Sequence, residues 1–134
     1  MREPDFDMDG WCLEDGEKRH REAPETFWLP ELRDRQSLEP GDLVKLIFRI
    51  SVDNEDEPVA VERMWVIVRE RVGDQYLGIL DNDPYAIDEN EELWNGTELP
   101  FSPRHVIDIH RRDAAAASDP MPLPTRFWDR DQEH

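Results

Sequence analysis

The stretch LVKLIFRISV at residues 43–52 decides the fold. Its odd positions mix apolar, charged and hydroxyl side chains, whereas its even positions are all apolar: Val44, Leu46, Phe48, Ile50 and Val52. Successive side chains of a strand point to opposite faces, so this alternation predicts a β-strand with one buried face. The start of the strand is marked by Pro40-Gly41, which predicts a turn with positive φ at the glycine.

Four further strands are predicted, at 59–72, 75–80, 97–101 and 106–109. The first two form a hairpin through Gly73-Asp74, and Gly78 within it marks a bend or a close approach of two backbones. Short strands joined by turns, with no long helix between them, favour a mainly β fold. The segment SPRHVIDI at 102–109 resembles the turn and final strand of SH3-like barrels. We predict a small antiparallel, partly closed SH3-like barrel with one or two short helical turns.

The composition divides the chain into three predicted regions, and the barrel lies in the second of them. Residues 1–22 form an acidic arm with few large apolar groups, which is either disordered or docked. Residues 23–112 form a single β-rich domain, including a packed segment at 26–38 that carries an apolar Phe27-Trp28 pair. Residues 113–134 form an Ala/Pro-rich tail, which Phe127-Trp128 could pin back on the domain.

The net charge of the chain disfavours two classes of binding partner, nucleic acids and membranes. The chain has 33 acidic and 16 basic residues, and its formal net charge of −17 repels phosphate backbones and anionic lipid surfaces. We therefore expect no direct nucleic-acid or membrane binding. A single cysteine, Cys12, allows no intramolecular disulfide, and no apolar run is long enough to cross a bilayer. These features predict a cytoplasmic protein.

No catalytic residue, metal site or cofactor site is predicted. The carboxylates Asp81, Asp83, Glu89 and Glu92 fit four positions of a calcium-loop template, but Ala86 replaces its turn glycine. His105 and Asp108 could form a base and its orienting group, but no nucleophile accompanies them, so a structural role is favoured. Cys12 lies among acidic residues that disfavour its thiolate, and we expect it to be inert.

A candidate binding site comes from the parity of basic residues on the first two strands. Five cations and a tryptophan all occupy odd positions: Lys45, Arg49, Arg63, Trp65, Arg69 and Arg71. If the strands pair with these positions on one face, an acidic protein presents a basic, tryptophan-bearing stripe. Such a stripe suits a carboxylate-rich or phosphate-bearing partner, although ordinary outward residues that balance nearby acids would give the same pattern.

Three segments together resemble the YegJ-like group of uncharacterised bacterial domains. They are ERMWV at 62–66, GILDNDP at 78–84, and GTELPF at 96–101 with Val106-Ile107-Asp108. The resemblance covers about half of the chain and implies a shared fold but no activity. It also implies that Trp65, Asn82, Pro84 and Gly96 are framework positions.

These observations predict a non-enzymatic protein-interaction or regulatory module of a bacterial cytosolic protein, whose partner is another protein. The alternative is an acidic inhibitor, either an immunity protein or a nucleic-acid mimic, that blocks a basic nuclease or DNA-binding protein. A small enzyme of unknown class is the third hypothesis. The sequence gives no oligomeric state.

Overall fold

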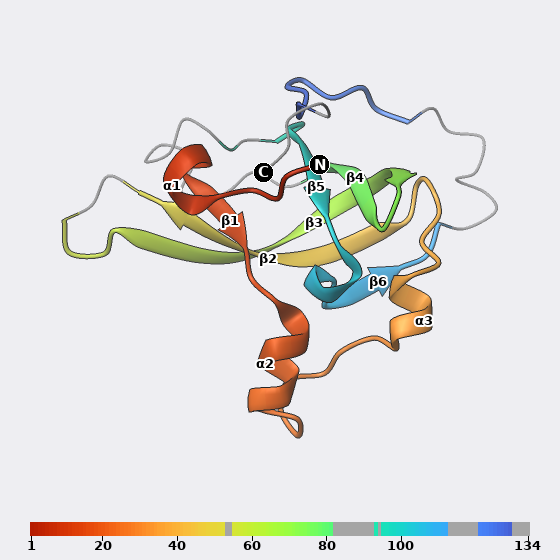
Figure 1. The fold of residues 1–134 in the computed structure, drawn as a ribbon, viewed down its shortest axis with the longest axis horizontal. Coiled ribbons are helices and arrows are strands. Elements are labelled where there is room, and N and C mark those ends of the chain that lie inside the picture. The colour runs from red at the N-terminus through yellow and green to blue at the C-terminus, as the bar shows by residue number, and fades with distance from the viewer. Residues whose placement is uncertain (53–54, 82–92, 94, 113–120, 130–134) are drawn as a thin grey trace.

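The chain is described by a computed structural model that covers residues 1–52, 55–81, 93, 95–112 and 121–129 (Figure 1). Its strands are β1 (Trp11–Leu13), β2 (Leu43–Ser51), β3 (Val59–Val72), β4 (Gln75–Leu80), β5 (Glu98–Phe101) and β6 (Asp108–His110). Its helices are short: α1 (Phe6–Asp9), α2 (Gly16–Glu22), α3 (Leu32–Arg35) and the 3₁₀ turn η2 (Pro103–His105).

The strands form one antiparallel sheet in the order β1-β2-β3-β4-β5. Strand β6 pairs with the first residues of β2, and β1 pairs with its last residues, so both lie along the same edge of β2. The sheet curls into a partly closed barrel, as Figure 1 shows. The predicted mainly β, antiparallel fold with few helical turns is thus confirmed.

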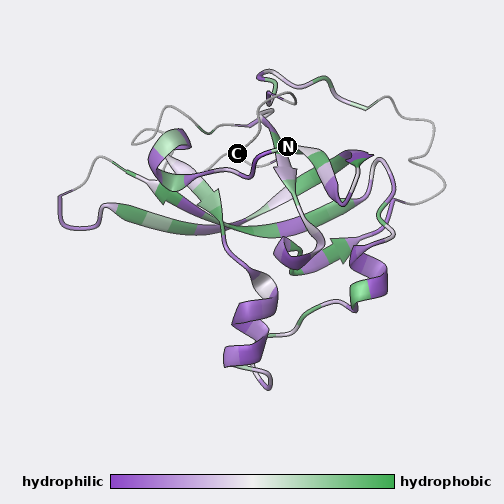
Figure 2. Ribbon diagram, in the orientation of Figure 1, coloured by the Kyte–Doolittle hydropathy of each residue, from purple (hydrophilic) through white to green (hydrophobic). Residues whose placement is uncertain are grey.

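The even positions of β2 face the inside of the curl, as the sequence predicted. Val44, Leu46, Phe48 and Ile50 are buried there, and side chains from β3, β4 and β5 join them in one core. In Figure 2 the strands carry the hydrophobic residues, whereas α2 is almost entirely hydrophilic. We refer to the core side of the sheet as the inner face and to the other side as the outer face.

A bulge in β3 changes which residues share a face. The pairing of β3 with β4 runs regularly from Val66 to Val68, skips Arg69, and resumes at Glu70. Because side chains alternate with a period of two, one extra residue moves every later side chain to the opposite face. Arg71 therefore pairs with Tyr76, a buried residue of the inner face.

The N-terminal arm is docked on the sheet. The sequence left open whether this arm is docked or disordered. Its strand β1 was not predicted, because three residues are too few to show a periodic pattern, although Trp11 and Leu13 are both apolar. Trp11 from β1 is only 2% exposed and contacts the Phe48 ring at a centroid distance of 5.8 Å. Just before β1, Asp5 caps α1 by accepting hydrogen bonds from the N–H groups of Asp7 and Met8.

Two predicted glycine roles are confirmed. Gly41 has a φ of 96°, which only a residue without a Cβ adopts readily, and it turns the chain into β2. At Gly78 a Cβ atom would lie 2.4 Å from Val66 Cγ1 and 2.8 Å from the carbonyl oxygen of Ile67. Strands β3 and β4 thus approach closely at this position, and a side chain there would push them apart.

Candidate functional site

Four residues of the predicted stripe lie together on the outer face. The register pairs Lys45 with Trp65, Ile47 with Arg63 and Arg49 with Val61, so these odd positions share one side of the β2–β3 ribbon. Together with Phe27, which lies against Arg63, we call these residues the cation–aromatic cluster: Phe27, Lys45, Arg49, Arg63 and Trp65. These odd positions of β2 and β3 therefore share one face, as the period of two predicted.

Aromatic rings position two of the three cations of the cluster. The Lys45 ammonium lies 4.8 Å from the centroid of the Trp65 ring, and the Arg63 guanidinium lies 5.4 Å from that of Phe27. Arg49 is half exposed and forms a 3.5 Å ion pair with Glu14. Cations held over rings keep their charge accessible while their stems pack, so the cluster suits carboxylate or phosphate groups of a partner.

The other two residues of the predicted stripe do not belong to the cluster. Arg71 follows the bulge, lies 5.7 Å from the Tyr76 ring and donates a hydrogen bond to the carbonyl of Gln36 (3.0 Å). Arg69, at the bulge itself, forms a 2.6 Å ion pair with Glu98 of β5. The parity prediction fails for Arg71 because a bulge cannot be recognised from alternation alone.

Of the predicted framework positions, Trp65 and Gly96 lie in the described residues, whereas Asn82 and Pro84 lie outside them. Gly96 has a φ of 92°, consistent with a turn that needs glycine, and its N–H donates to the carbonyl of Leu80 (2.8 Å). The calcium-loop template also falls almost wholly outside the described residues. Within those residues, no group of three or more His, Cys, Asp or Glu side chains is placed to hold a metal ion.

Cys12 and His105 have environments that oppose reactivity at neutral pH. Burial, and to a smaller extent Glu14, raises the pKa of the Cys12 thiol, although Arg49 opposes this shift. Burial and the neighbouring charge of Arg104 lower the pKa of His105 to about 4. The Nδ1 atom of His105 accepts a hydrogen bond from the Ser102 N–H (2.9 Å), which gives the ring a structural role at the start of η2.

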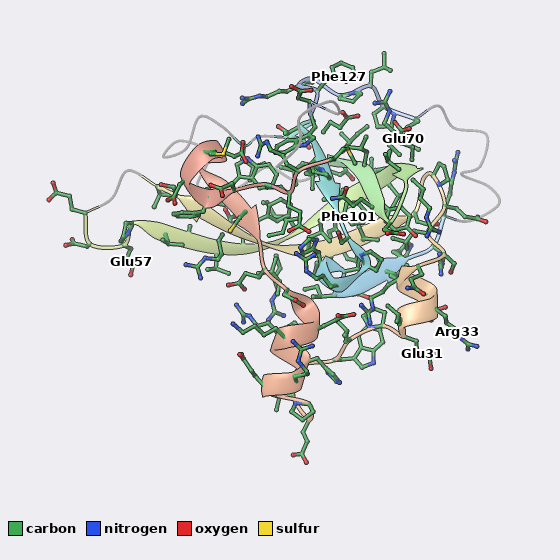
Figure 3. The ribbon with its side chains drawn as sticks, in the orientation of Figure 1. Glu31, Arg33, Glu57, Glu70, Phe101 and Phe127 are labelled. Carbon is green, nitrogen blue, oxygen red and sulfur yellow. The ribbon has the colours of Figure 1, made fainter. Side chains whose placement is uncertain are left out.

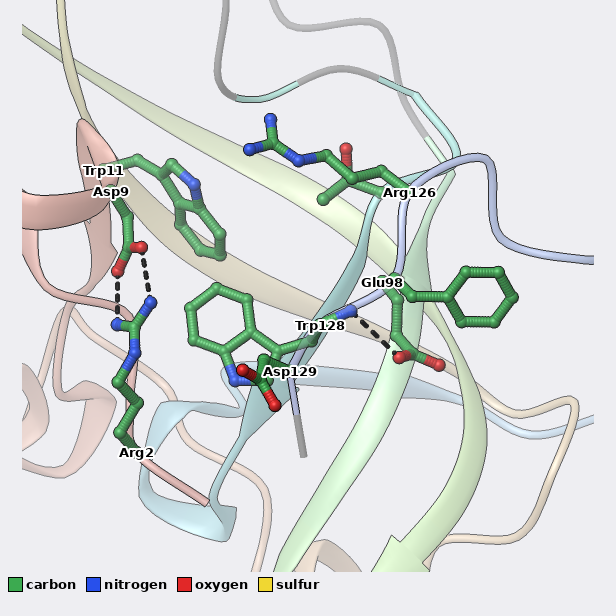
Figure 4. Close-up of a pocket in the computed structure, with 9 residues that line it drawn as sticks. Arg2, Asp9, Trp11, Glu98, Arg126, Trp128 and Asp129 are labelled. Atoms are coloured by element: carbon green, nitrogen blue, oxygen red, sulfur yellow. Dashed lines mark hydrogen bonds and ion pairs between the residues drawn. The ribbon is translucent and has the colours of Figure 1, made fainter. Parts of the chain in front are cut away.

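A second site, which the sequence did not predict, lies where the two terminal segments meet (Figure 4). We call it the tail groove. It is a hollow of ≈180 Å³ lined by Arg2, Asp9, Trp11, Thr97, Glu98, Arg126, Phe127, Trp128 and Asp129. The signal available in the sequence was the Phe127-Trp128 pair, but nothing in the sequence shows that it meets Trp11.

No family model matches this sequence, and neither a curated protein nor a solved structure matches it at a significant level. The likeness to the YegJ-like group and the likeness to SH3 barrels therefore stay predictions. None of the helices in the described ranges is long and apolar enough to cross a membrane.

Proposed function

We propose that this chain is a non-enzymatic protein-interaction module that binds another protein through the cation–aromatic cluster. The observation that carries the proposal is the shared placement of Lys45, Arg49, Arg63 and Trp65 on the outer face of one strand pair. Tryptophan and arginine are the residues most enriched at the energetic centres of protein interfaces. The partner class that fits three cations, two of them held over aromatic rings, is a protein surface rich in carboxylate or phosphate groups.

The net charge of −17 bears on this partner class, since it repels an anionic protein at a distance. At physiological ionic strength such repulsion is screened beyond about 8 Å, so contacts within the interface determine the affinity. Long-range repulsion lowers the association rate instead. We expect a slowly formed complex that depends on the local contacts of Lys45, Arg49 and Arg63.

The acidic-inhibitor hypothesis gives the opposite dependence on these residues. An inhibitor of a basic nuclease or DNA-binding protein would use carboxylates, and its binding would weaken steeply as salt rises. Its affinity would be unchanged or improved by removing arginines. The same set of variants therefore separates the two functions.

The test is co-purification with the double variant Arg49→Ala/Arg63→Ala. A tagged chain is recovered from its native cells, and the retained proteins are quantified by mass spectrometry for the wild type and the variant. If the cluster is the binding site, retention of the specific partner falls about tenfold or more, because truncating central arginines commonly costs about 2 kcal/mol or more.

The matched control is Arg33→Ala/Arg71→Ala, which removes the same charge from residues outside the cluster. Arg33 is exposed on α3, and Arg71 lies beyond the bulge. This control should retain the partner, and thermal unfolding must show that both double variants are folded. Equal retention by the wild type and both variants would contradict the proposal, whereas salt-sensitive retention of a basic nuclease or DNA-binding protein, independent of Arg49 and Arg63, would support the inhibitor function.

A further inference from the structure

The C-terminal segment at 121–129 adds to the edge of the sheet. It crosses the top of the molecule in Figure 1 and lies beside β5, the last strand in the sheet order. The N–H of Thr125 donates to the carbonyl of Gly96 (2.9 Å), and the N–H of Glu98 donates to the carbonyl of Arg126 (2.8 Å). Thr97 and Arg126 form a parallel bridge. Backbone groups of the edge therefore recognise this segment as an added strand.

Trp128 anchors the segment against the N-terminal arm, across the tail groove. Its ring meets Trp11 edge-on at a centroid distance of 6.1 Å, and the Arg2 guanidinium lies 4.4 Å from its centroid. Arg2 is fixed by two 2.7 Å hydrogen bonds to Asp9, as Figure 4 shows. The groove thus has an aromatic wall and a cationic wall, both supplied by the N-terminal arm.

Glu98 accepts a hydrogen bond from the backbone of the segment. This carboxylate has no exposed surface, forms the ion pair with Arg69, and accepts the N–H of Trp128 at 3.1 Å. Arg69 in turn lies 5.7 Å from the ring of Phe127. A buried carboxylate that forms an ion pair on one side can accept a main-chain N–H of an extended peptide on the other.

Several side chains of the segment face the solvent. Phe127 is 63% exposed and Leu123 is 78% exposed, and Thr125 and Arg126 are also exposed. Phe127 projects from the molecule on the side opposite α3 in Figure 3. Pro124 is buried and Trp128 is half-buried, so these two side chains and the edge hydrogen bonds hold the segment on the sheet. An edge segment with several exposed side chains has the features of a unit that opens before the rest of the sheet.

From these contacts we propose that the edge of β5 and the N-terminal arm, which form one side of the tail groove, are a binding site for an extended Arg-Phe-Trp segment. The chain's own residues 125–128 lie on this site in cis and form the other side of the groove. The same segment of a second copy is the occupant that replaces them. The fit of that occupant is given by the contacts described, because an exchanged segment makes the same ones. The proposal uses a different surface from the cation–aromatic cluster and does not depend on the proposed function.

The test uses a labelled peptide of residues 121–129 and the full chain with Trp128→Ala, which removes the anchor from the cis segment. Fluorescence polarisation should show the peptide binding the variant about tenfold or more tightly than the wild-type chain, whose tethered segment competes at about millimolar effective concentration. A peptide that carries Trp128→Ala should bind neither chain. Failure of the wild-type peptide to bind the folded variant, or equal binding to both chains, would overturn the proposal.

Hydrogen exchange of the wild-type chain decides the question if the Trp128→Ala variant does not fold. The Glu98 amide, bonded to Arg126, should exchange at least tenfold faster than the buried amides that pair β2 with β3, because the segment opens without global unfolding. Equal protection of these amides would make the segment an integral strand and would overturn the proposal.

Discussion

Replacing Trp11 by alanine is expected to lower the free energy of unfolding by about 3–5 kcal/mol, the usual cost of truncating a buried tryptophan. The side chain is almost fully buried between Phe48 of β2 and Trp128 of the C-terminal segment. Its removal leaves a cavity, because Phe48 and Trp128 are held by their own segments and cannot both move in to fill the space. A loss of this size is a large fraction of the stability of a domain of this length. Urea unfolding monitored by far-UV circular dichroism measures it.

Trp28→Ala is the matched control, since it removes the same side chain from a position that is 68% exposed. We expect a change within about 0.5 kcal/mol, as for most surface substitutions. Equal losses for the two variants would mean that the arm does not contribute its tryptophan to the core. A small effect of Trp11→Ala alone would mean the same.

Acidification is expected to destabilise the protein through His105. Its pKa is about 4 in the folded chain and 6.5 in the unfolded chain, since burial and Arg104 disfavour the charged ring. The unfolded state therefore binds the proton first. The contribution of the neutral ring is fully present above pH 6.5 and is lost as the pH falls toward about 4. The pKa difference corresponds to about 3 kcal/mol.

The hydrogen bond of His105 also favours the neutral ring in the folded state. Nδ1 accepts the Ser102 N–H, so a proton placed on that nitrogen would remove the acceptor. Protonation would thus break the hydrogen bond that starts η2 as well as bury a charge. Both effects oppose the charged ring in the folded state.

The experiment compares the wild type with His105→Gln over pH 7.5 to 4 by urea unfolding. Glutamine at this position of a capping box can still accept the N–H of Ser102, but it does not titrate. Carboxylates such as Asp9, whose pKa the Arg2 hydrogen bond lowers against the effect of burial, titrate in both proteins and cancel in the difference. The wild type should lose about 3 kcal/mol more than the variant. Parallel stability curves would show that His105 is solvated.

Strands β2 to β6 were predictable because each carries its own local signal, whereas β1 is too short to show one. The alternation in 43–52 places β2 and its buried face, and Gly73-Asp74 marks the hairpin that joins β3 to β4. Gly41 and Gly78 reveal positions where backbone geometry excludes a side chain. The outward placement of Lys45, Arg49, Arg63 and Trp65 follows from the same period of two.

What the sequence by itself determined was therefore the class of fold, the bounds of its main strands and the residues of the cation–aromatic cluster on β2 and β3. Tertiary structure decided the rest. The bulge beside Arg69 reverses the face of Arg71, and no alternation in the sequence marks its position. Trp11 and Trp128 lie near opposite ends of the chain. Their rings meet because the C-terminal segment pairs with the edge of the sheet next to β5. Local periodicity reports which face a side chain takes, but not which distant segment covers it.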